Sequence, residues 1–185
     1  MSILVMILIF ICIGVDNMVS SNMSAMKMDA EKKSIFSIKT ALFFAGFNAL
    51  FFGLGYFVSI IFFRNWVYLA HNWVAFAFLL LLGIKFMMES IEKSPSFSSV
   101  DADDTRKLIK VSTLMGLNAF LVGYALETMD TTFFPQFILL VLVTFGLTLL
   151  GFHLGGPSSK TIASKKIELI AGLILIIMAI RVIII

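Results

Sequence analysis

The sequence is poor in the side chains that bind soft metals. It has one cysteine, Cys12, and two histidines, His71 and His153, among 185 residues. A single cysteine excludes an internal disulfide and a metal site built from several thiolates. Zn²⁺ and Cu⁺ prefer imidazole and thiolate ligands, and both histidines stand near the ends of apolar segments. We therefore expect any metal bound by this chain to be held by oxygen atoms.

Charge is scarce as well. Charged residues make up 14% of the chain and hydrophobic residues 60%. In a soluble domain about a quarter of the residues are charged and about half are hydrophobic. The sequence also lacks the Gly-x4-Gly-Lys-Ser/Thr motif that cradles nucleotide phosphates. We therefore expect a membrane protein that does not hydrolyse ATP and is not an enzyme.

The apolar residues fall into six long runs, which predict an all-α polytopic membrane protein with six transmembrane helices. About 20 residues are needed for each span, so 185 residues leave no room for a soluble domain. We expect one transmembrane domain over residues 1–185. The predicted spans lie near residues 3–24, 39–62, 73–91, 108–128, 134–155 and 166–185.

Lys and Arg residues are distributed unevenly among the connections. All but two of the 14 belong to the first, third and fifth connections and their flanks, Lys85 included; the exceptions are Arg64 and Arg181. Basic residues favour cytoplasmic loops, so these three connections are expected inside and both termini outside. Lys85 and Arg181 are expected to extend toward opposite membrane surfaces, as long cationic side chains near helix ends commonly do.

The two halves of the chain resemble each other. Gly14-Val15-Asp16 aligns with Gly116-Leu117-Asn118 at an offset of 102 residues, and Asn48 aligns with Thr144 at an offset of 96. With three spans each, the halves must cross the bilayer in opposite directions. We predict two inverted repeats, about 1–92 and 108–185, joined by a cytoplasmic linker at about 93–107. Inverted repeats build many transporters, whose sites lie near the midplane where the halves meet.

Polar residues near the middle of four spans form the candidate site. They are Asp16, with Asn17 beside it, and Asn48, Asn118 and Thr144. A carboxylate within lipid costs about 3 kcal/mol or more unless something compensates it, so Asp16 is predicted to be functional. Hard divalent cations such as Mg²⁺ and Mn²⁺ favour oxygen ligands, so we predict a metal site made by these five residues. For Asn48 and Thr144 the alternative is that they only tie helices together.

Other acidic residues have structural or open interpretations. Glu168 is expected to favour the start of the sixth helix through the helix dipole. The acids at 101–104 lack the Gly and distal Glu of a calcium loop, which favours a solvated linker. Glu127 and Asp130 could attract cations to the outer mouth of a transport path or could simply solvate a loop.

Several motifs resemble the MntP-type manganese efflux pumps of the LysE transporter superfamily. Residues 71–76, His-Asn-Trp-Val-Ala-Phe, are similar to the start of that family's third span, and residues 165–173, Lys-Lys-Ile-Glu-Leu-Ile-Ala-Gly-Leu, to its sixth. Residues 14–17 and 116–119 stand where the family has Met-Asp-Ala-Phe-like and Leu-Asp-Ala motifs. The resemblance covers nearly the whole chain and agrees with its length, topology and repeat.

The resemblance implies export of Mn²⁺ across the inner membrane, with manganese as the transported substrate and without a cofactor. Two positions depart from the family: Asn118 stands where it usually has Asp, and Asn48 where it usually has Glu. One carboxylate balances a divalent charge less well than two or three. Two alternatives therefore stay open, an exporter of a small organic solute such as an amino acid and a non-transporting homologue. The expected partners are a divalent metal ion and membrane lipid, not nucleic acid, and the oligomeric state is left open.

Overall fold

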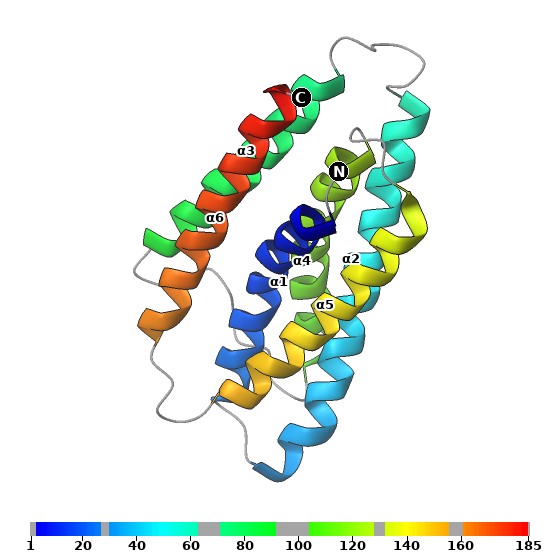
Figure 1. The fold of residues 1–185 in the computed structure, drawn as a ribbon. Coiled ribbons are helices and arrows are strands. Elements are labelled where there is room, and N and C mark those ends of the chain that lie inside the picture. Colours follow the sequence, from blue (N-terminus) through cyan, green and yellow to red (C-terminus); the bar gives the residue numbers. More distant parts are fainter. Residues whose placement is uncertain are drawn as a thin grey trace.

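The computed structural model describes residues 3–26, 30–62, 71–91, 104–127, 132–155 and 161–184. Within these ranges the regular structure is six α-helices, without any strand, so the predicted all-helical fold is confirmed. Most helix ends lie within a few residues of the predicted spans. The helices are α1 (Ile3–Ala25), α2 (Ala30–Phe62), α3 (His71–Ile91), α4 (Thr105–Glu127), α5 (Phe133–Leu154) and α6 (Thr161–Ile184) (Figure 1).

Within the described residues, five of the helices are long and apolar enough to cross a membrane. They contain the segments Val5–Ala25, Lys33–Ile61, Trp73–Ile91, Thr105–Glu127 and Phe133–Leu154. Large apolar side chains also cover the outside of the bundle, including Ile35, Phe134 and Leu142, each more than half exposed. Lipid solvates such a surface, whereas in water it would drive association. The chain is therefore a multi-pass membrane protein, and a sixth span through α6 stays a prediction.

The helix α2 begins well before the span predicted from 39. Its 33 residues give a length of about 50 Å, more than the hydrocarbon core of about 30 Å. Much of the basic first connection is therefore helical. Lys33 Nζ donates a hydrogen bond of 2.7 Å to the carbonyl of Gly155, the C-cap of α5. A cation at this helix end is favourable because of the helix dipole.

The helix α1 occupies the centre of the bundle (Figure 1). It contacts α2, α4, α5 and α6, while α2 also packs on α4 and α5, and α3 packs on α4 and α6. Its polar residues Asp16, Asn17 and Ser20 are fully buried. The central position therefore turns these side chains toward protein and not toward lipid.

Helix directions alternate along the chain. In Figure 1, α1, α3 and α5 run downward and α2, α4 and α6 run upward, so the start of α1 and the end of α6 lie toward the same end.

Asp104 fixes where α4 begins, because its Oδ1 accepts a hydrogen bond of 3.0 Å from the backbone N–H of Lys107 and so caps the helix. The remaining acids of the predicted linker, 101–103, lie outside the described residues.

Candidate cation site

Asp16 of α1 and Asn118 of α4 meet side chain to side chain. Asn118 Nδ2 donates a hydrogen bond of 2.6 Å to Asp16 Oδ2. Asp16 is 0% exposed and Asn118 is 4% exposed, so water does not separate them. The two residues that the internal repeat paired are therefore neighbours in space, as predicted.

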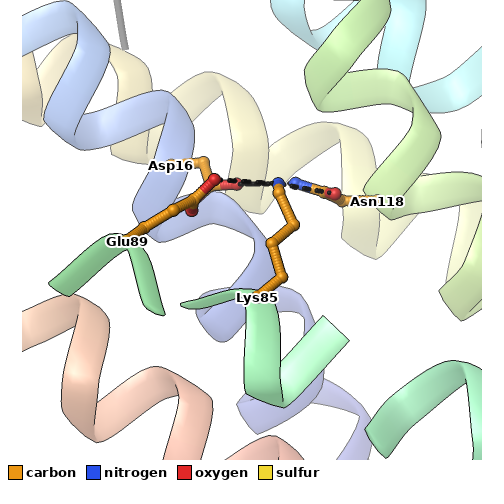
Figure 2. A network of polar contacts seen from close by, with 4 residues as sticks. All are labelled: Asp16, Lys85, Glu89 and Asn118. Atoms are coloured by element: carbon orange, nitrogen blue, oxygen red, sulfur yellow. Dashed lines mark hydrogen bonds and ion pairs between the residues drawn. The ribbon is translucent and has the colours of Figure 1, made fainter. Parts of the chain in front are cut away.

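Lys85 reaches the same point from α3 (Figure 2). Its ammonium donates a hydrogen bond of 3.0 Å to Asn118 Oδ1 and lies 3.7 Å from Asp16 Oδ2. The expectation that Lys85 extends to the membrane surface is wrong, because a carboxylate and an amide oxygen compensate its charge inside the bundle. Because Lys85 lies inside the bundle, it no longer counts among the basic residues whose position indicates the cytoplasmic side of the membrane. Arg181, by contrast, is exposed near the end of α6.

Two further acids belong to this neighbourhood. Glu89 stands one turn after Lys85 on α3, with its Oε1 3.5 Å from the Lys85 ammonium. Glu168 of α6 is 4% exposed, and α6 packs against α1, which carries Asp16, and against α3, which carries Glu89. The helix-dipole interpretation of Glu168 misses this burial. The pair Lys85 and Glu89, four residues apart within an apolar span, is the sequence signal that could have drawn attention to α3.

Asn48 and Thr144 form a separate pair between α2 and α5. Asn48 Nδ2 donates a long hydrogen bond of 3.5 Å to Thr144 Oγ1, and both side chains are buried. Thr144 also accepts a bond of 2.7 Å from Thr148 at its backbone carbonyl. The hydrogen bonds described for Asn48 and Thr144 do not reach Asp16 or Asn118, so a cavity shared by all four residues stays a prediction. The contact fits the alternative in which they tie helices together.

Several buried polar atoms of α1 and α2 have no hydrogen-bond partner among the described residues. They are Asp16 Oδ1, both side-chain atoms of Asn17 and the Ser20 hydroxyl on α1, with Asn48 Oδ1 on α2. An unsatisfied buried group costs about 1–3 kcal/mol, so such atoms indicate room for a ligand or for ordered water. Asn17, a predicted ligand, is buried, and its side chain makes no hydrogen bond to Asp16 or Asn118.

Across the described ranges, no cluster of three or more His, Cys, Asp or Glu residues is arranged to hold a metal ion. A pocket of about 630 Å³ lies elsewhere, where Lys33, Ser34 and Ser37 of α2 face Gly146 and His153 of α5. Beside Asp16 and Asn118, which bind each other directly, lies the ammonium of Lys85.

The acid at the far end of α4 is bound to its neighbour helix. Ser59 of α2 donates a hydrogen bond of 2.7 Å to Glu127 Oε2. This contact gives Glu127 a structural role between α2 and α4 that neither sequence-based interpretation included. Asp130 lies outside the described residues.

Comparisons with known proteins agree on one family. A family model described as "Putative manganese efflux pump" matches residues 30–183. Proteins named "Putative manganese efflux pump MntP" are similar to this chain. The one from Crocosphaera subtropica is 30% identical over 148 residues, which cover 80% of this chain and 78% of that protein. The one from Methanothermobacter thermautotrophicus is 30% identical over 155 residues, covering 82% and 80%.

A third relative extends the coverage. The protein of the same name from Campylobacter jejuni is 27% identical over 172 residues, covering 86% of this chain and 91% of its own. No solved structure gives a significant match. The family model spans α2 to α6 nearly completely, including Lys85, Glu89, Asn118 and Glu168. The chain therefore belongs to the MntP family of manganese efflux pumps.

Proposed function

We propose that this protein exports a divalent cation, Mn²⁺ in the first place, across the cytoplasmic membrane. The observation that carries the proposal is the buried carboxylate of Asp16, which holds an ammonium together with Asn118 inside an apolar bundle. Such a site binds positive charge where lipid would otherwise exclude it. The relatives named as manganese efflux pumps support the identity of the ion. Mn²⁺ is then a transported substrate, and the chain needs neither a cofactor nor catalysis.

Charge balance supports a divalent ion despite Asn48 and Asn118. Glu89 Oε1 lies 3.5 Å from the Lys85 ammonium, and Glu168 is buried on α6. When Asp16, Glu89 and Glu168 are all ionised, these three acids and the one base Lys85 leave an excess of negative charge that a divalent cation can neutralise. Oxygen from carboxylates and amides is also the ligand type that Mn²⁺ and Mg²⁺ prefer.

The close contacts of two glycines support an arrangement of two inverted three-helix repeats. A Cβ on Gly55 of α2 would collide with the carbonyl oxygen of Phe120 on α4. A Cβ on Gly151 of α5 would collide with the carbonyl oxygen of Met18 on α1. Gly151 follows Gly55 by 96 residues and Phe120 follows Met18 by 102, the offsets seen in the sequence. The two contacts are therefore equivalent under exchange of the halves 1–92 and 108–185.

Two hydrogen bonds support the same symmetry. Asp16 and Asn118 are separated by 102 residues, and Asn48 and Thr144 by 96. A pseudo-twofold axis that exchanges the halves would bring each of these residues opposite its own counterpart. An axis in the membrane plane relates the halves of many transporters and passes near their binding sites.

The proposed orientation has both termini outside and the first, third and fifth connections in the cytoplasm. Lys33, Arg106 and Lys166 stand near the starts of α2, α4 and α6, which lie at one end of the bundle (Figure 1). Glu89 and Glu168 lie on this side of their helices, so they would meet a cation coming from the cytoplasm.

Cysteine labelling from outside, in a background with Cys12 replaced, tests this orientation. Ser98 and Tyr68 are suitable positions in opposite connections, and both lie outside the described residues. Labelling of Tyr68→Cys but not Ser98→Cys is expected. Labelling of Ser98→Cys alone would refute both the orientation and the argument from basic residues.

Export also needs a source of energy. Moving a cation outward against 100 mV costs about 2.3 kcal/mol per charge. Exchange of the departing cation for a proton at Asp16 is our proposed source, because Asp16 is the buried acid at the centre of the site. Acidification of proteoliposomes during Mn²⁺ export, measured with an internal dye, would reveal this exchange.

A second candidate function is export of a small organic solute such as an amino acid. The observation that favours it is that Asp16 and Asn118 already hold a primary ammonium, the group that amino acids carry. This candidate predicts efflux of an amine and no effect on cellular manganese.

Growth of a manganese-sensitive bacterial strain separates the candidates. Cells expressing the protein should grow at raised Mn²⁺ and contain less manganese by mass spectrometry. Asp16→Asn should abolish both effects, whereas Asp104→Asn, which changes an exposed acid, should not. Wild-type protein in the membrane without any change in cellular manganese would refute manganese export.

A further inference from the structure

The ammonium of Lys85 lies among oxygens of three different side chains. It is 3.0 Å from Asn118 Oδ1, 3.5 Å from Glu89 Oε1 and 3.7 Å from Asp16 Oδ2 (Figure 2). Carboxylate and amide oxygens are the atoms that a hard cation would take as ligands. The ammonium therefore stands in the coordination space that a metal ion bound to Asp16 would need.

Lys85 is placed so that it can leave this position. Its side chain is 39% exposed, whereas that of Asp16 is 0% exposed, so the lysine enters the buried site from the periphery. The lysine side chain is also a flexible four-carbon chain that ends in a compact charge. Glu89, one turn along the same helix, can keep the ammonium paired after it moves away from Asp16.

Simultaneous occupancy of the site by both cations is unfavourable. A metal ion on Asp16 and an ammonium still bound to Asn118 would be a few ångströms apart, and like charges repel strongly where water is excluded. A cation can therefore bind only if Lys85 withdraws. A divalent ion gains about twice the Coulomb attraction of a monovalent one from the same carboxylate, so it displaces the ammonium more readily than Na⁺ or K⁺ does.

We propose that Lys85 is an internal competitor for the transported cation and a determinant of its charge. In the empty site its ammonium compensates Asp16, and when a divalent cation binds, the ammonium moves to Glu89. The competition excludes abundant monovalent ions and weakens divalent binding enough for release. This inference rests on the proposed function, because it concerns the same site.

Titration calorimetry of the purified protein with MnCl₂ tests the proposal. Lys85→Met keeps an unbranched side chain of nearly the same length and removes its charge. We expect at least tenfold tighter Mn²⁺ binding, with competition by Na⁺ that the wild type does not show. Lys110→Met, which changes an exposed lysine of α4, is the matched control and should bind like the wild type.

The outcomes separate the two proposals. If the wild type binds Mn²⁺ and Lys85→Met binds it no more tightly, Lys85 is only a structural counter-ion and this inference is wrong. If neither the wild type nor Lys85→Met binds Mn²⁺, the proposed function fails as well. Tight binding by Lys85→Met alone would support the inference, because the natural lysine would then be the obstacle.

A second measurement avoids any effect of Lys85→Met on folding. Acetic anhydride acetylates lysine amines in the unaltered protein, and mass spectrometry reports the rate at each position. Saturating MnCl₂ should raise the rate at Lys85 severalfold, because the amine leaves its hydrogen bond to Asn118, while Lys110 should react at an unchanged rate. An unchanged rate at Lys85 with Mn²⁺ bound would overturn the proposal.

Discussion

The two buried pairs, Asp16–Asn118 and Asn48–Thr144, join residues at the two offsets of the internal repeat, yet they differ in charge and in surroundings. The first pair has a hydrogen bond of 2.6 Å and contacts Lys85; the second has a bond of 3.5 Å between neutral groups. The first therefore has the features of an ion site and the second those of a helix contact. A repeat places polar groups at equivalent positions, but it does not give them equal chemistry.

The third helix of each half shows the same inequality. Lys85 of α3 and Arg181 of α6 are equivalent at the offset of 96. Lys85 turns inward to Asp16 and Asn118, whereas Arg181 is exposed. The acid that attracts Lys85 has Asn118 as its counterpart in the other half, and an amide exerts less attraction on a cation than a carboxylate does. The charge of Asp16 thus accounts for the difference in side-chain contacts between the two halves.

Neutralising Asp16 should remove this difference and have the largest effect. Asp16→Asn would make the first pair resemble the second, and we expect Mn²⁺ transport in proteoliposomes to fall by at least a hundredfold, because no buried acid remains beside Asn118. Asn48→Leu is the matched change in the other pair and should retain transport within a few fold. Equal losses in the two variants would show that both pairs belong to one site.

Adding a second acid should sharpen the comparison. Asn118→Asp supplies a charge and a second oxygen, and we expect it to strengthen Mn²⁺ binding at least tenfold. Two adjacent acids repel each other, so one should hold a proton until the metal displaces it. Calorimetry in buffers of different ionisation enthalpy measures both the affinity and the released proton. Unchanged affinity with Asp16 intact would favour the organic-solute candidate.

The sequence predicted the helices and one contact between them. Apolar runs located the helices, and the internal repeat paired Asp16 with Asn118 across 102 residues. It did not predict the inward turn of Lys85, because the usual rule for a lysine near a helix end considers only the distance to the membrane surface. Here the partner acid lies on another helix. The burial of Glu168 was missed for the same reason, since its neighbours are set by the packing of α6 against α1 and α3.

Glycine substitutions should test the repeat with an intermediate effect on stability. Gly55→Ala and Gly151→Ala place a methyl group against a carbonyl of the neighbouring helix, and we expect each to lower the free energy of unfolding by about 1–3 kcal/mol. Gly46→Ala and Gly146→Ala, where nothing lies within 4 Å, should be neutral or stabilising by up to about 1 kcal/mol. Denaturant titration in mild detergent measures these values. If only one of the two substitutions, Gly55→Ala or Gly151→Ala, lowers the free energy of unfolding strongly, the two contacts are not equivalent.

The smallest effect is expected at the second pair, and it decides whether Thr144 belongs to the metal site. Thr144→Val removes the acceptor of the Asn48 bond at nearly constant volume. Bonds of this kind between membrane helices contribute about 0.6 kcal/mol on average, so the unfolding free energy should fall by roughly that amount. A double-mutant cycle with Asn48→Leu isolates the contribution of the bond. Mn²⁺ binding should not change, because we place the ion at Asp16, and the hydrogen bonds of Asn48 and Thr144 do not reach that residue. A tenfold loss of Mn²⁺ affinity in Thr144→Val, with stability nearly intact, would instead place Thr144 and Asn48 around the same ion as Asp16, as the five-residue metal site predicted from the sequence requires.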